Sequence, residues 1–211
     1  MKKFLFGVLF IVMLSGMAAA QNQSDEYNKV EIFAGYSGAF TLSADDSVAD
    51  VDHGFNVAAV YNFHKYFGVK VDASGTFGKV SGNYFSPFGS PPIPVREFRA
   101  DHSLYNLTAG IQFKNNKRDA VAKPFGHVLV GVGKHTDKFT TSCPTGAVCP
   151  PFDQDITGLS VIFGGGLDVK VNRRIDIRAI QFDINTISGE SGVQKAYYHN
   201  FRFSSGIVFK F

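Results

Sequence analysis

The stretch Phe67-Gly-Val-Lys-Val-Asp-Ala-Ser-Gly-Thr-Phe77 alternates between two kinds of residue. Its odd-numbered positions are apolar or small, whereas Lys70, Asp72 and Thr76 are polar. Successive side chains of an extended strand point to opposite faces, so this stretch predicts a β-strand with one apolar face and one charged face. A tilted strand of about ten such residues is long enough to cross the hydrocarbon core of a bilayer.

Seven further segments repeat this pattern, although two of them are less regular. Counted along the chain, the fifth of the eight segments has Leu129, which breaks the alternation. In the seventh, the apolar phase changes, which indicates a β-bulge near 179–181. An even number of strands is typical of single-chain bacterial membrane barrels. The expected strands are 29–40, 53–63, 67–77, 103–113, 124–134, 159–170, 175–184 and 199–211.

The connections between these segments alternate in length. The long ones are 41–52, 78–102, 135–158 and 185–198, and the short ones are 64–66, 114–123 and 171–174. Membrane barrels have long extracellular loops and short periplasmic turns, so the order fits a chain with both termini in the periplasm. We therefore expect an all-β fold, an eight-stranded antiparallel up-and-down transmembrane β-barrel over residues 21–211. A soluble β-sandwich is the alternative, since its strands would alternate in the same way.

The first twenty residues have the form of a cleaved secretory signal peptide. Lys2 and Lys3 precede the apolar run 4–14, and Ala18-Ala19-Ala20 offers a cleavage site before Gln21. An uncleaved anchor is the alternative, but the apolar run is short for a membrane-spanning helix. The expected location is the cell outer membrane.

Cys143 and Cys149 lie beyond this signal peptide, in a chain expected to reach an oxidising compartment. A disulfide that closes the short loop is the interpretation we favour. A metal-binding pair is the alternative, but no nearby His or Cys would supply two further ligands.

The net charge excludes one class of partner. The formal charge is +3, and removal of Lys2 and Lys3 leaves 19 basic against 18 acidic residues. A nucleic-acid-binding protein would show a clustered basic face, and the sequence has none.

The end of the chain, Ser204-Ser-Gly-Ile-Val-Phe-Lys-Phe211, resembles the signal read by the barrel-assembly machinery of Gram-negative outer membranes. The residues that make up this signal are Gly206, Phe209 and Phe211. With VEIFAGYSGAF at 30–40, KPFGHVLVGVG at 123–133 and FRFSSGIVFKF at 201–211, the chain resembles small OmpA-like outer-membrane barrels without their peptidoglycan-binding domain. The resemblance implies outer-membrane lipid, the assembly machinery and periplasmic chaperones as partners.

Charged residues occupy the face that would point into the barrel. They are Glu31, Lys70, Asp72, Asp168, Lys170, Asp176, Arg178 and Arg202. An eight-stranded barrel is just wide enough to be filled by side chains, and buried charges need partners. We expect an ion-pair network that plugs the lumen; a narrow gated pore is the alternative.

No catalytic, metal or cofactor site is expected. Asp101-His102-Ser103 is the nearest approach to a catalytic group, but adjacent strand residues point to opposite faces. Loops on a rigid scaffold commonly carry binding functions. The expected function is therefore non-enzymatic: envelope structure and surface contact through the extracellular loops. A narrow passive channel or ligand-binding barrel comes second, and a lipid-modifying enzyme third.

Overall fold

The computed structural model describes residues 27–41, 51–85, 94–117, 120–142, 152–191 and 194–211. Alternating side chains and long unbroken backbone pairing make nearly all of them β-strand. The strands are β1 (Val30–Thr41), β2 (Asp52–His64), β3 (Phe67–Phe85), β4 (Pro94–Lys114), β5 (Ala122–Ser142), β6 (Phe152–Lys170), β7 (Ile175–Ser191) and β8 (Gln194–Lys210).

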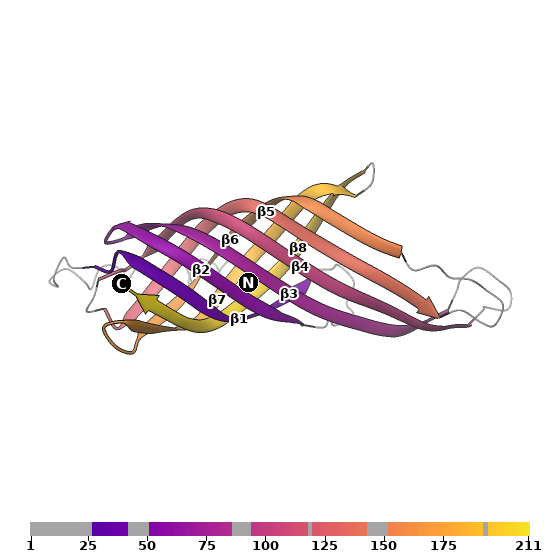
Figure 1. Ribbon diagram of the computed structural model, residues 1–211, viewed down its shortest axis with the longest axis horizontal. Helices are drawn as coiled ribbons and strands as arrows, with labels where there is room; N and C mark the ends of the chain where they lie inside the picture. The colour runs from indigo at the N-terminus through magenta and orange to yellow at the C-terminus, as the bar shows by residue number, and fades with distance from the viewer. Residues whose placement is uncertain (1–26, 42–50, 86–93, 118–119, 143–151, 192–193) are drawn as a thin grey trace, which may run out of the picture.

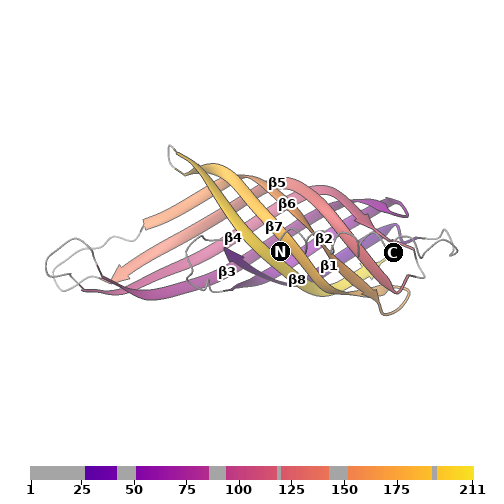
Figure 2. The same cartoon turned by 180° about the vertical axis from the view of Figure 1, so that it is seen from behind.

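The eight strands form one closed antiparallel barrel, as Figures 1 and 2 show from opposite sides. Each strand pairs with the next, and β1 pairs with β8 from Glu31–Lys210 to Thr41–Asn200. Closure leaves no unpaired strand edge over the length that β1 and β2 share with the other strands, which a barrel in lipid requires. The expected fold class is confirmed.

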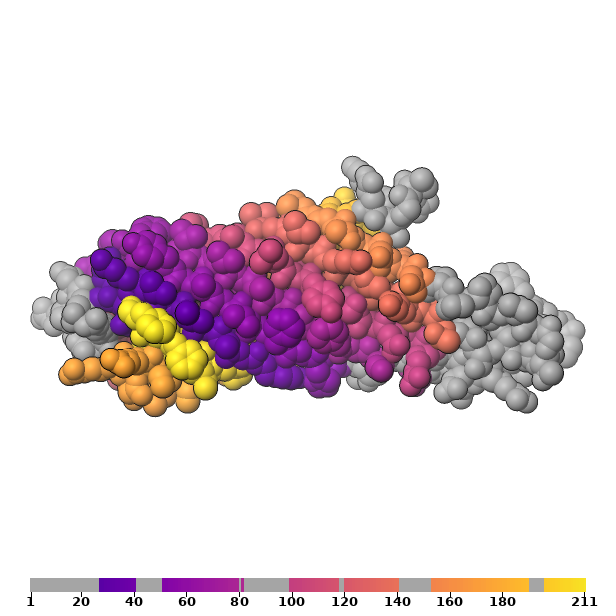
Figure 3. All heavy atoms as spheres, viewed as in Figure 1, coloured from indigo at the N-terminus to yellow at the C-terminus, as the bar shows by residue number. Residues whose placement is uncertain are grey.

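The two faces of the wall are the reverse of those in a soluble protein. Side chains that point into the lumen are mostly polar and buried, whereas large apolar side chains point outward. Leu107 and Phe163 are 62% and 64% exposed, for example. On the face seen in Figure 3, the side chains of neighbouring strands pack into a continuous wall. An apolar outer band of this kind faces lipid.

The described residues contain no helix of the length and apolar character that a helical membrane crossing requires.

Most strands are longer than the sequence pattern indicated. β3 to β6 have 19 to 21 residues each, against 12 and 13 in β1 and β2. In Figure 1 these four strands run past the ends of β1 and β2. The expected bounds were wrong because the apolar alternation reports only the part of a strand that faces lipid, whereas backbone pairing continues into water.

The connections change accordingly. Those expected at 78–102, 135–158 and 185–198 consist largely of paired strand, and the β7–β8 connection is only 192–193. The β4–β5 connection, which was expected to be short, is longer than the β7–β8 connection, which was expected to be long. The alternation therefore lies mainly in how far each hairpin extends beyond the apolar band, and less in the length of its loop. We call the end with these extended hairpins the outer end, and the opposite end, where β1 begins and β8 ends, the inner end.

A bulge lies where the sequence predicted one. In β7 the register with β8 shifts between Arg178 and Gln181, and the register with β6 shifts at the same place. The extra residue moves Ile180 and Phe182 onto the lipid-facing side while Asp183 points inward. The signal peptide at 1–20 and the Cys143–Cys149 disulfide lie outside the described residues, and both stay predictions.

Candidate functional site

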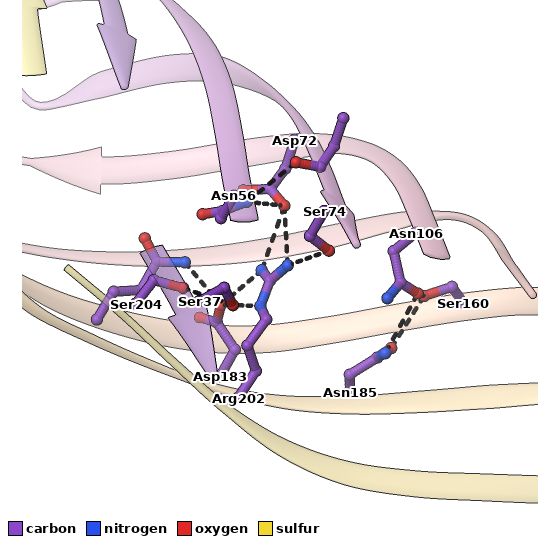
Figure 4. Close-up of polar contacts among 12 residues, drawn as sticks. Ser37, Asn56, Asp72, Ser74, Asn106, Ser160, Asp183, Asn185, Arg202 and Ser204 are labelled. Carbon is purple, nitrogen blue, oxygen red and sulfur yellow. Dashed lines mark hydrogen bonds and ion pairs between the residues drawn. The ribbon is translucent and has the colours of Figure 1, made fainter. Parts of the chain in front are cut away.

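Arg202 of β8 is the centre of a charged cluster in the middle of the lumen (Figure 4). Its guanidinium donates to Asp183 Oδ2 from Nε at 3.0 Å and from Nη2 at 2.6 Å. On the opposite wall it donates to Asp72 Oδ1 from Nη1 and Nη2, both at 3.2 Å. Asp72 also accepts from Asn56 at 2.8 Å and lies 3.1 Å from Lys70 Nζ. One arginine therefore joins β8 to β3 across the barrel.

A second charged cluster lies nearer the inner end. Lys114 Nζ of β4 donates to Glu31 of β1 at 2.6 Å and to Asp168 of β6 at 2.7 Å. Arg178 of β7 donates to the same Asp168 carboxylate from Nε at 2.8 Å and from Nη2 at 3.1 Å. These side chains come from four strands and are fully buried. Their charges are compensated within the lumen, as burial requires.

The Arg178 guanidinium also lies between two aromatic rings. Its Cζ is 4.2 Å from the ring centroid of Phe33 and 4.3 Å from that of Phe125. Both rings point inward and are buried. A guanidinium between two aromatic faces gains cation–π attraction on both sides. Gln181 connects this cluster to the central one, since it accepts from Arg178 at 2.7 Å and donates to Asp183 at 2.6 Å.

A third group of charges is placed at the inner end. Asp176 accepts from Lys123 Nζ at 2.9 Å and also contacts Lys210 Nζ. Lys170, which the sequence placed in the lumen network, is only half-buried there. The other seven predicted lumen residues are all fully buried inside the barrel.

Gly164 of β6 allows side chains of β5 and β7 to meet across it. Gly164 is paired with His127 on one side and Asp183 on the other. His127 Nε2 lies 3.0 Å from Asp183 Oδ1, and a Cβ on Gly164 would stand 2.0 Å from that oxygen. The glycine is needed here for space and not for backbone conformation.

Toward the outer end the lumen becomes less charged. Asn106, Ser160 and Asn185 form a hydrogen-bonded set, also seen in Figure 4, with contacts of 2.9 to 3.2 Å. A buried apolar cluster of Leu104, Ile156 and Ile187 follows. The partly buried Ala196 and Tyr198 of β8 pack against it.

At the outer edge of this apolar cluster lies a group of His102, His135 and Asp137, in which His135 is paired with both Leu104 and Ile156. His102 Nδ1 is 2.5 Å from Asp137 Oδ1, and His135 Nε2 is 3.1 Å from the same carboxylate. The outward-facing residues beside His102 and Asp137 include the charged Lys79, Asp101 and Lys138 and, toward the inner end, the exposed aromatic Phe77. The group therefore lies at the outer edge of the lipid-facing band.

The electrostatics of this group favour a charged carboxylate. The hydrogen bond to Asp137 raises the pKa of His102, against partial burial. Partial burial also disfavours the charged form of Asp137, but hydrogen bonds from both histidines outweigh it and hold the pKa of this carboxyl well below its usual range.

The residues weighed as catalytic are separated by this arrangement. His102 pairs with Asp137 on the lumen side, whereas Ser103 lies on the opposite face of β4. His199, near the outer end of β8, is exposed and lies 3.0 Å from Thr186 Oγ1. His102 and Ser103 are therefore not arranged as a base and its nucleophile, and the hydroxyl beside His199 is that of Thr186.

Several residues of the lumen network were missed by the sequence interpretation. Lys114 and Lys123 fall at the ends of a connection that was expected to be a turn. Asp183 follows the bulge. Continuing the changed apolar alternation past residue 181 would have placed its side chain in the lumen. Phe33 and Phe125 carried no signal, since aromatic residues are expected on the lipid face. The missed residues are Phe33, Lys114, Lys123, Phe125, His127, Gln181, Asp183 and Lys210.

Comparison with known proteins identifies the family. The outer membrane protein beta-barrel domain family matches residues 6–211. The chain belongs to this family. As in other members, the barrel places the protein in the cell outer membrane, and the expected location is confirmed. No curated protein sequence matches the chain.

Solved structures of other small outer-membrane barrels share this fold. Neisserial surface protein A has a TM-score of 0.59 at 14% identity, with 88% of this chain and 99% of that chain covered. Ail, the attachment invasion locus protein of Yersinia pestis, has a TM-score of 0.51 at 19% identity, with 88% and 100% covered. OprG from Pseudomonas aeruginosa has a TM-score of 0.50 at 16% identity, with 90% and 98% covered. At these identities the likeness extends to the fold alone.

Proposed function

We propose that this protein is a non-enzymatic, non-conducting outer-membrane barrel that supports the envelope and makes contacts at the cell surface. The observation that carries the proposal is that ion pairs cross the lumen between strands that are not neighbours. Arg202 of β8 reaches Asp72 of β3, and Lys114 of β4 reaches both Glu31 of β1 and Asp168 of β6.

Opening a passage would require these contacts to break. Removing one partner of a buried ion pair costs about 3–5 kcal/mol, because the other charge is left uncompensated. The charged clusters are linked through Gln181 and lie beneath an apolar layer, so a continuous water path would have to cross both. A barrel of eight strands has little spare width in which this could happen.

The extended hairpins support the surface role. β5 and β6 continue past the apolar band, and their outward faces become polar there. Lys134 and Asp155 form an exposed ion pair at 3.2 Å on this part of the wall. A paired, polar sheet that stands above the bilayer is a rigid platform for the outer loops, which is where binding commonly occurs on such scaffolds.

Planar-bilayer recording tests the closed lumen. We expect the purified protein to give no stable conductance steps. The variant Arg202→Ala, which removes the cross-lumen bridge and its side-chain volume, should give more frequent brief openings. Stable, ion-selective steps from the unaltered protein would contradict a plugged barrel and favour a narrow channel.

Assembly partners are part of the same proposal. Phe209 and Phe211 are exposed on the outer face at the end of the chain, and Gly206 packs closely against Gly35 of β1. An aromatic strand end is suited to recognition by strand addition. We infer that the barrel-assembly machinery reads this segment after periplasmic chaperones deliver the chain, and that the folded barrel is held by outer-membrane lipid.

A further inference from the structure

We propose that His102, His135 and Asp137 bind a divalent transition-metal ion such as Zn²⁺ at the outer end of the barrel. The three side chains come from two neighbouring strands. His102 on β4 is paired directly with Asp137 on β5, and His135 is two residues before Asp137 on the same inward face. All three potential ligand atoms lie within 4.8 Å of one another.

The chemistry of these groups suits such an ion. Two imidazole nitrogens and one carboxylate oxygen form a ligand set used by zinc sites with an open coordination position. Ligand atoms around tetrahedral zinc stand about 3.3 Å apart, given bonds of about 2.0–2.2 Å. The present separations of 2.5 and 3.1 Å from Asp137 are close to this value, so small rotations of the rings would admit an ion. Ca²⁺ and Mg²⁺ prefer oxygen ligands and should bind poorly.

The site is both supported and accessible. The His135 ring is buried and stacks on Tyr198 with ring centroids 3.7 Å apart, which fixes one ligand. Its Nδ1 atom accepts or donates no hydrogen bond among the described residues. The side chains of His102 and Asp137 are partly exposed, at 24% and 17%, so water reaches the site.

A second carboxylate adds to the negative potential. Asp52 of β2 reaches over Gly78 of β3 toward His102, which is paired with Gly78. A Cβ on Gly78 would stand 1.6 Å from Asp52 Oδ1, so the glycine is what lets this carboxylate approach. Asp52 is itself buried.

The sequence interpretation expected no metal ligands, because His102 and the pair His135–Asp137 are more than thirty residues apart. Antiparallel pairing of β4 with β5 brings them together. The inference is independent of the closed lumen, since none of the three proposed ligands takes part in the charged clusters around Arg202, Arg178 and Asp176.

Metal titration tests the proposal. The full chain would be purified from membranes in detergent with an affinity tag that contains no histidine, then stripped with a chelator. We expect one equivalent of Zn²⁺ to bind in calorimetric titration, with no displacement by excess Ca²⁺. His102→Gln and His135→Gln should each weaken binding at least tenfold, and Asp52→Asn should weaken it by less.

His199→Gln is the matched control, because it removes a histidine at the same end of the barrel that is outside the group. It should leave binding unchanged. Heat-dependent gel mobility would show that each variant is folded. If His135→Gln fails to fold, His102→Gln still tests the proposal, because His102 is partly exposed. Co²⁺ in place of Zn²⁺ should give visible absorption bands that disappear in His102→Gln. Absence of saturable binding, or equal binding in His102→Gln and the unaltered protein, would overturn the proposal.

Discussion

Replacing Arg202 by Met removes a buried cation while keeping much of its volume. The change leaves Asp72 and Asp183 facing each other across the lumen without the guanidinium that joins them. Breaking a buried ion pair by removing one partner costs about 3–5 kcal/mol. Two pairs break here, but each carboxylate keeps another partner, Lys70 for Asp72 and His127 for Asp183. We therefore expect the free energy of unfolding to fall by about 4 kcal/mol, roughly a thousandfold in the folded-to-unfolded ratio.

Urea unfolding in detergent or vesicles measures this change. The chain contains no Trp, so unfolding would be followed by far-UV circular dichroism and by gel mobility without boiling. Lys79→Met is the matched control, because Lys79 and Asp101 form a pair at 3.8 Å that is 72% and 46% exposed. Such surface pairs contribute about 0–1 kcal/mol.

A second substitution checks the cause of the loss. In the Arg202→Met background, Asp183→Asn removes one of the two uncompensated charges and should recover part of the stability. If Arg202→Met lost less than about 1 kcal/mol, no more than the surface control, the buried pairs would not be holding the barrel together.

Two further variants test the packing and the assembly signal. Gly164→Ala should destabilise the barrel by about 2 kcal/mol or more in the same urea assay, since the added Cβ meets a carboxylate oxygen at 2.0 Å and a backbone carbonyl at 2.4 Å. Gly126→Ala, whose Cβ would meet only one atom at 3.7 Å, should be close to neutral, and equal losses would refute the steric argument. Phe211→Ala should lower the amount of heat-modifiable barrel in the outer-membrane fraction several-fold, whereas Phe163→Ala, on the lipid face but away from the chain end, should not; the reverse order would contradict a terminal signal.

The central part of each strand could be predicted because a membrane barrel imposes one rule on every residue there. The alternation of Val69 and Val71 with Lys70 and Asp72 follows directly from lipid on one side and a packed lumen on the other. The bulge in β7 was visible for the same reason, as a change of phase. Beyond the apolar band this rule ends, which is why strand in β3 to β6 was taken for loop.

The partners of the lumen charges could not be predicted. The sequence placed Arg202 and Asp72 on the inward face, but their contact joins β8 to β3 across a closed wall. Lys114 was read as part of a turn, although it compensates two carboxylates. The aromatic sandwich around Arg178 runs against the expectation that rings face lipid.

By itself, the sequence determined the class of fold, the number of strands and the inward face of seven of the eight predicted lumen charges, because these depend on a local period of two residues and on the composition of each face. The tertiary structure alone decided which charges pair, how far the hairpins extend, and that His102 meets His135 and Asp137. Those features depend on strand register, tilt and closure, which bring together residues that the chain keeps far apart.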